Sequence, residues 1–134
     1  MTRDPRDLYC AIDFGTSNSA IGIPHADGMK LVELEPGFRT MPTAVFYNVE
    51  DETRSFGREA VKAYVDGYDG RLMRSIKSIL GSDLMEQTTE IGHGISIKYL
   101  DVVIGYLKHL KRVAEAQHGR PLTRAIVGRP VWFV

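Results

Sequence analysis

The sequence contains very little that could crosslink the chain or attach it to a membrane. Its one cysteine, Cys10, excludes an internal disulfide, and its apolar surroundings favour a buried, inert thiol over a catalytic one. No apolar run approaches the roughly 20 residues of a membrane-spanning helix. The first residues lack the apolar segment of a secretory signal. These absences predict a cytoplasmic protein in a reducing compartment, with no membrane partner.

The sequence also lacks an excess of either charge and any recognisable arrangement of metal-binding histidines. Its 17 Lys and Arg residues balance 17 Asp and Glu residues, so a nucleic-acid partner is not expected. The 4 histidines show no ligand spacing, which argues against a histidine-held metal site. What is present, 43% hydrophobic and 25% charged residues in a chain of 134, is typical of one globular domain.

Hydrophobic patterning predicts a chain that mixes strands and helices. Short apolar runs between turn residues predict strands over residues 8–14, 19–24, 29–35, 42–49 and 122–128. Apolar residues at helical spacing predict helices over residues 58–65, 72–80 and 99–117. Glycines follow the last two of these segments, as expected at helix ends.

The last ten residues, 125–134, are mostly apolar, whereas natural chains usually end in polar residues. A buried terminal strand is one interpretation. The interpretation we favour is a segment cut from a longer protein. Such a cut would leave a strand edge and apolar side chains without cover, so we expect the segment to self-associate through its C-terminal strand.

The polar turn after the first predicted strand has the clearest chemical content. Gly15 allows the backbone to turn tightly and to approach a ligand closely. The N–H groups of residues 15 to Asn18 can form a nest for phosphate oxygens, and Thr16 and Ser17 add hydroxyl donors. Asp13, at the strand exit, can hold Mg²⁺ through its water shell. The segment is neither a Walker loop nor a dinucleotide fingerprint, and a polar hairpin that binds nothing is an equally open interpretation.

Five segments, taken in order, resemble the seventy-kilodalton heat-shock (DnaK-like) chaperone family. The first, residues 11–23 (AIDFGTSNSAIGI), is similar to the first phosphate motif of the actin, hexokinase and heat-shock ATPase superfamily. The others are similar to the chaperone branch and cover residues 41–47 (MPTAVFY), 56–65 (FGREAVKAYV), 73–81 (MRSIKSILG) and 95–133. The resemblance therefore spans nearly the whole chain.

The resemblance implies an α/β fold: part of a ribonuclease-H-like (actin-like ATPase) lobe with a smaller α+β subdomain inserted in it. Residues 1–36 and 119–134 are expected in the lobe, and residues 37–118 in the inserted subdomain. Typical family members carry a longer, strand-rich insertion where this chain has only residues 82–94. The inserted subdomain, subdomain IB of the family, is therefore expected to be reduced.

The resemblance also implies a site for ATP or ADP with Mg²⁺. Asp13 matches the family aspartate near Mg²⁺, and residues 15–18 match the loop around the β- and γ-phosphates. Lys77 matches the lysine that helps position the attacking water and stabilise the γ-phosphate. Pro130 matches the proline that relays the nucleotide state to the substrate-binding half, although residues 128–129 depart from the usual sequence before it.

The implied function is that of an ATP-hydrolysing chaperone whose partners are nucleotide, unfolded client proteins and co-chaperones. The family's second phosphate loop and adenosine loop do not occur in this sequence, so the segment alone is expected to be inactive. Two alternatives stay open. One is an actin-like structural ATPase, which residues 73–81 disfavour; the other is a chaperone-like interaction protein that binds nucleotide without hydrolysing it.

Overall fold

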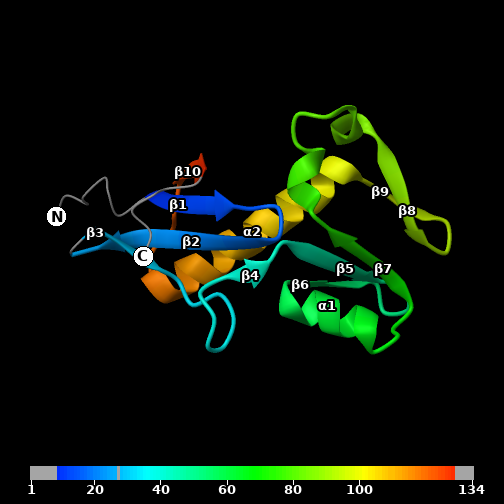
Figure 1. The fold of residues 1–134 in the computed structure, drawn as a ribbon, viewed down its shortest axis with the longest axis horizontal. Helices are drawn as coiled ribbons and strands as arrows, with labels where there is room; N and C mark the ends of the chain where they lie inside the picture. The colour runs from blue at the N-terminus through cyan, green and yellow to red at the C-terminus, as the bar shows by residue number, and fades with distance from the viewer. Residues whose placement is uncertain (1–8, 27, 129–134) are drawn as a thin grey trace.

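The protein has a mixed α/β fold, as the sequence predicts (Figure 1). The structure is a computed structural model, and it describes residues 9–26 and 28–128. The strands are β1 (Tyr9–Phe14), β2 (Asn18–His25), β3 (Gly28–Leu31), β4 (Met41–Pro42), β5 (Ala44–Asn48), β6 (Thr53–Phe56), β7 (Gly70–Arg74), β8 (Thr88–Gly92), β9 (Ile95–Lys98) and β10 (Arg124–Gly128). The helices are α1 (Arg58–Val65), α2 (Tyr99–His118) and the short 3-10 helices η2 (Ile76–Ile79) and η3 (Asp83–Glu86).

The first sheet contains the N-terminal strands and the last strand. Its order is β10-β1-β2-β3, and β4 pairs with the beginning of β2. β1 pairs antiparallel with β2 and parallel with β10. A parallel neighbour needs a crossover connection, and α2 supplies it because it leads into β10. The strand β1 is thus held on both edges, and its apolar residues are buried.

A second sheet of order β6-β5-β7 lies beside α1, and β8 and β9 form a separate hairpin. Four of the five residues of β5 are buried, which fits its central place in this sheet. Ala60 of α1 packs against Ala44 and Phe46 of β5 in a small apolar cluster. The helix predicted over residues 58–65 is confirmed with these bounds.

Helix α2 joins the two sheets. It crosses from the β8–β9 hairpin to the sheet of β1 and β2 (Figure 1). Val102, Val103, Tyr106 and Leu110 lie on its buried face, and they belong to a core that includes residues of β1, β2 and β5. The helix ends at Gly119, whose φ of 77° is left-handed, as the sequence predicts. Among the described residues, no helix combines the length and the hydrophobicity needed to cross a membrane.

The prediction of a helix over residues 72–80 is wrong. Residues 70–74 form β7, in which Met73 lies opposite Val45 of β5, and only Ile76–Ile79 turn, as the 3-10 helix η2. A short isolated helix is marginal in water, whereas a strand paired with β5 gains the hydrogen bonds of an existing sheet. The prediction also missed the strands β6, β8 and β9. The connection over residues 82–94 contains η3, β8 and the turn that leads to β9.

Cys10 is buried, as the sequence predicts. Its Sγ donates a weak hydrogen bond to the Arg124 carbonyl of the neighbouring strand, at 3.6 Å. Burial raises the pKa of the Cys10 thiol, and the charge of Glu115 raises it further. Because the thiolate is the reactive form, both effects lower the reactivity of this thiol.

The contact between α2 and β6 should make the stability of the folded chain depend on pH. His109 stacks on Phe56 with the ring centroids 4.3 Å apart and the planes 13° from parallel. Burial lowers the pKa of His109 and the charge of Arg112 lowers it further, while Glu59 and Glu35 oppose the shift. The unfolded chain then binds a proton more readily than the folded one. Stability is therefore lost as the pH falls through the ordinary histidine value of 6.5.

We expect the urea midpoint of the 134-residue chain to fall between pH 7.5 and pH 5.5. The variant His109→Phe keeps a ring on Phe56 but has no proton to bind, so it should lose less stability over this range. His25→Gln, at an exposed position at the end of β2, should behave like the unmodified chain. An equal loss in the His109→Phe variant would show that other groups cause the pH dependence.

Candidate functional site

The polar turn predicted to bind phosphate connects β1 to β2. Phe14 pairs with Ser19 across the two strands, and the Gly15 N–H donates to the Asn18 carbonyl at 3.0 Å. A Cβ atom on Gly15 would lie 2.3 Å from that carbonyl oxygen, so only glycine fits here. Gly15 is buried, while Thr16, Ser17 and Asn18 are exposed at the tip. We call residues 15–18 the phosphate hairpin.

Two hollows border the phosphate hairpin, and Thr16, Ser17 and Asn18 line both of them. The first has a volume of about 300 Å³ and is lined by Asp13, residues 15–20 and Thr40. The second has a volume of about 340 Å³ and is lined by Thr16, Ser17, Asn18, Pro42, Thr43, Ala44, Val61, Arg74 and Ser75. Each is of a size that could hold phosphate groups and a hydrated cation, and each borders solvent.

The structure brings Asp13 and the phosphate hairpin together, but it does not place Lys77 with them. Lys77 is exposed on η2 and lines neither hollow. Arg74 and Ser75, from the same segment, line the second hollow. Ser75 has a left-handed φ of 53°, which turns the chain sharply between β7 and η2. The predicted role of Lys77 therefore stays a prediction, and Pro130 lies outside the described residues.

Three residues beside the phosphate hairpin were missed by the sequence analysis. Thr40 lines the first hollow, and Thr43 and Arg74 line the second. Arg74 is the cationic residue of these two linings, and it was assigned to a helix. One sequence feature could have identified Thr43: it places a hydroxyl in a mostly apolar run that is expected to be buried. A buried hydroxyl needs a hydrogen-bond partner.

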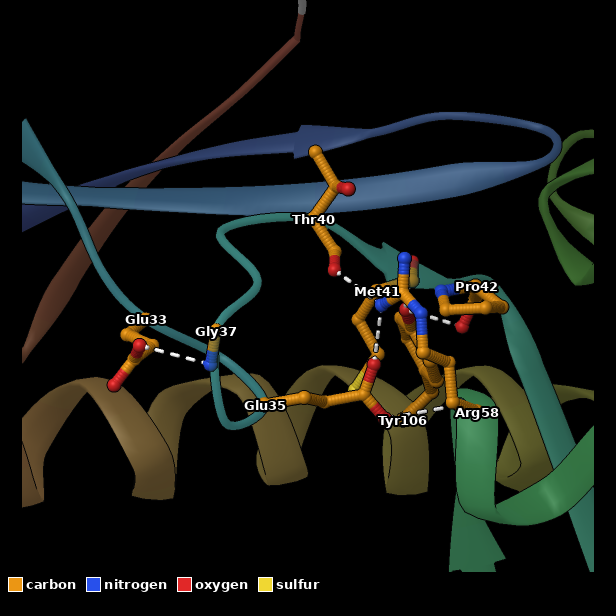
Figure 2. Close-up of polar contacts among 8 residues, drawn as sticks. All are labelled: Glu33, Glu35, Gly37, Thr40, Met41, Pro42, Arg58 and Tyr106. Atoms are coloured by element: carbon orange, nitrogen blue, oxygen red, sulfur yellow. Dashed lines mark hydrogen bonds and ion pairs between the residues drawn. The ribbon is translucent and has the colours of Figure 1, made fainter. Parts of the chain in front are cut away.

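The segment over residues 32–43, which carries Thr40 and Thr43 and includes β4, is fixed by ionic and polar contacts (Figure 2). Arg58 Nη1 lies 2.6 Å from Glu35 Oε1 and also donates to the Thr40 carbonyl at 2.8 Å. The Arg58 backbone N–H donates to Glu35 Oε2 at 2.9 Å, so Glu35 caps the N-terminus of α1 from outside. The Arg58 guanidinium lies 3.6 Å from the centre of the Phe38 ring. These contacts define the path of this segment from β3 to β4.

Tyr106 of α2 contacts the same segment at β4 (Figure 2). Its hydroxyl donates to the Pro42 carbonyl at 3.0 Å, and the Met41 carbonyl lies at 3.3 Å. Burial raises the pKa of Tyr106 to about 12. This tyrosine is therefore neutral at all physiological pH values and acts as a hydrogen-bond donor.

Asp13 is the carboxylate that lines the first hollow, and it is the residue of this lining that could hold a metal ion. Within residues 9–26 and 28–128, no three His, Cys, Asp or Glu side chains gather closely enough to hold a metal between them. A single carboxylate suits Mg²⁺, which keeps several waters and takes further oxygens from a bound phosphate. Asp13 borders the first hollow, so a hydrated Mg²⁺ beside it would lie next to the phosphate hairpin.

Comparison with known proteins identifies the family. The family model described as Hsp70 protein matches residues 9–104. The chain is 28% identical to the chaperone protein DnaK of Mycoplasmopsis pulmonis (strain UAB CTIP) over 129 residues, which are 96% of this chain and 20% of that protein. It is 26% identical to the chaperone protein DnaK of Burkholderia cenocepacia (strain HI2424) in an alignment 142 residues long, gaps included, that covers 91% of this chain and 22% of that protein. The chain spans about a fifth of the length of these curated relatives. Because the family model covers more than half of it, the chain belongs to the Hsp70 protein family.

Proposed function

We propose that this chain forms one wall of a Mg·ATP site in a heat-shock-type chaperone that hydrolyses ATP. The observation that carries the proposal is the phosphate hairpin at the exit of β1 in a member of the Hsp70 family, bordered by one hollow that Asp13 lines and a second that Arg74 lines. The N–H groups and hydroxyls of Thr16 and Ser17 bind the β- and γ-phosphate oxygens. Asp13 holds the waters of Mg²⁺, which neutralises the charge of the phosphates.

The cationic residues have separate roles in this proposal. Arg74 lines the second hollow and attracts the phosphate groups. Lys77 extends from η2, whose Ile76 and Ile79 are buried in the core and fix its backbone. Lys77 orients the attacking water and stabilises charge on the γ-phosphate, as the family resemblance implies. Phosphoryl transfer depends mainly on such positioning and charge neutralisation.

We also propose the two-part organisation that the resemblance implies. Residues 1–36 and 119–134 form part of the ribonuclease-H-like lobe, and residues 37–118 form the inserted, reduced subdomain. The strand order of the first sheet, with one parallel pair between β1 and β10, supports this division. β4 and α2 belong to the inserted range but also contact β2, so they connect the two parts.

Hydrolysis would switch the affinity of the chaperone for unfolded clients, and Pro130 and co-chaperones would take part in that switch. A second candidate is a chaperone-like protein that binds nucleotide without hydrolysing it. It is favoured by one observation, the absence of Lys77 from the described linings of both hollows. The two candidates predict the same affinity for nucleotide and differ in turnover.

Calorimetric titration with Mg·ATP tests the proposal. The 134-residue chain alone should bind with a dissociation constant in the millimolar range or weaker, about −4 kcal/mol, because it offers only one wall of the site. A longer protein that contains this chain and the remaining regions of its relatives should bind at least about a hundredfold more tightly. In that protein, Asp13→Asn should reduce the Mg²⁺ dependence of binding, while the exposed control Asp83→Asn should not.

A longer protein with no affinity for nucleotide would contradict the proposal. Micromolar binding by the 134-residue chain as a monomer would show instead that the site lies elsewhere in this chain. Unchanged Mg²⁺ dependence in Asp13→Asn would remove Asp13 from the metal site.

A further inference from the structure

We infer that Thr43 is a positioning residue that aims the Thr16 amide at the bound phosphate. The inference rests on the proposed nucleotide site, and it concerns a residue to which neither the motif nor the family match gives a role. Thr43 lies between β4 and β5 and is 2% exposed, so its hydroxyl must find its partners within the protein. Those partners belong to the phosphate hairpin and its flank.

The hydrogen bonds of Thr43 have a defined direction. Thr43 Oγ1 donates to the Gly15 carbonyl at 2.9 Å. A carbonyl can only accept, and a hydroxyl has one proton, so the proton of Thr43 is committed to Gly15. Ser19 Oγ lies 2.7 Å from Thr43 Oγ1 and must therefore donate to it. The result is a buried chain of two hydrogen bonds that runs from Ser19 through Thr43 to the Gly15 carbonyl.

These two hydrogen bonds fix the peptide plane between Gly15 and Thr16. In a planar trans peptide, the C=O and N–H groups point in opposite directions. Because Thr43 holds the Gly15 carbonyl toward the interior, the Thr16 N–H points away from the interior, toward the exposed tip. Within the described part of the chain, the amides of Thr16 and Ser17 donate to no other residue. They are therefore available to an anion.

Thr43 is itself held in place from two directions. Its backbone N–H donates to the Ser17 carbonyl at 3.0 Å, so it contacts the phosphate hairpin at two points. The preceding residues are fixed by Tyr106 of α2 and by Arg58 of α1 (Figure 2). The turn residues alone do not set the orientation of the Thr16 amide. The orientation is set through Thr43 by the elements packed behind it.

The test compares ligands with and without phosphate in the longer protein. Thr43→Val keeps the shape and the backbone contact to Ser17 but removes the hydroxyl. It should weaken ADP binding roughly tenfold, the scale of one hydrogen bond to a charged group, and change adenosine binding less than about twofold. Thr43→Ser, which retains the hydroxyl, should restore most of the ADP affinity. Thr89→Val is the matched control, because Thr89 is also buried but accepts from Arg71 far from the hairpin in sequence.

The control should lower thermal stability without changing the ratio of ADP to adenosine affinity. If Thr43→Val does not fold, Ser19→Ala tests the same pair of hydrogen bonds by removing the donor to Thr43. It should weaken ADP binding about threefold and leave the affinity for adenosine unchanged. Equal losses for ADP and adenosine, or no loss for ADP, would overturn the role of Thr43. An unmodified protein that binds ADP no better than adenosine would overturn the proposed phosphate site, and this inference with it.

Discussion

Replacing Lys77 by alanine in the longer protein should lower the rate of ATP hydrolysis about a hundredfold or more. A preorganised cation contributes most where negative charge moves between oxygens, as it does in phosphoryl transfer. Nucleotide affinity should change little, because Lys77 lines neither hollow beside the phosphate hairpin. The fold should also persist, since the Lys77 side chain is exposed while Ile76 and Ile79 anchor η2.

The variant Arg74→Ala serves as the comparison, because it should affect nucleotide binding more than hydrolysis. Arg74 lines the second hollow, so its loss should weaken nucleotide binding more than it slows the hydrolysis of bound nucleotide. Single-turnover hydrolysis and a binding titration on both variants separate the two effects. Hydrolysis at the unmodified rate by Lys77→Ala would make Lys77 a surface lysine. No hydrolysis by the unmodified protein, with binding intact, would favour the non-hydrolysing chaperone-like protein.

Gly57→Ala should destabilise the fold by about 3 kcal/mol or more. Gly57 precedes α1 with φ 65° and ψ −133°, a combination essentially confined to glycine. A Cβ atom there would lie 2.2 Å from Met41 Cγ and 2.9 Å from Glu35 Oε2. Alanine would therefore strain the backbone and also displace the carboxylate that holds Arg58.

Gly67→Ala is the control for the backbone contribution. Gly67 has a left-handed φ of 83°, but an added Cβ atom would meet nothing within 4 Å. Gly67→Ala should lower the free energy of unfolding by only about 1 kcal/mol. Urea denaturation of the 134-residue chain at low concentration compares the two variants. Equal destabilisation would mean that the loop adjusts without loss and that the contacts of Glu35 and Met41 do not depend on Gly57.

The two long helical segments and the phosphate hairpin were determined by the sequence itself. Residues 58–65 and 99–118 form helices because their apolar side chains recur at helical spacing, and Gly119 provides the left-handed end of the second. The hairpin is local in the same sense. Gly15 and its polar neighbours make a tight turn between two strand-forming runs, and the Gly15–Asn18 hydrogen bond joins residues that are close in the chain.

Only the tertiary structure decided the rest of the site. The apolar spacing of residues 72–80 predicts a helix, but pairing with β5, distant in the sequence, makes residues 70–74 a strand and brings Arg74 to the hairpin. The sequence does not distinguish Thr43 from other polar residues in strands. The fold places its hydroxyl 2.9 Å from the Gly15 carbonyl oxygen. Helix periods, caps and tight turns involve residues within a few positions, so the sequence records them directly. Strand partners and buried hydrogen bonds join residues that only the folded core brings together, and no local pattern specifies which residue will be the partner.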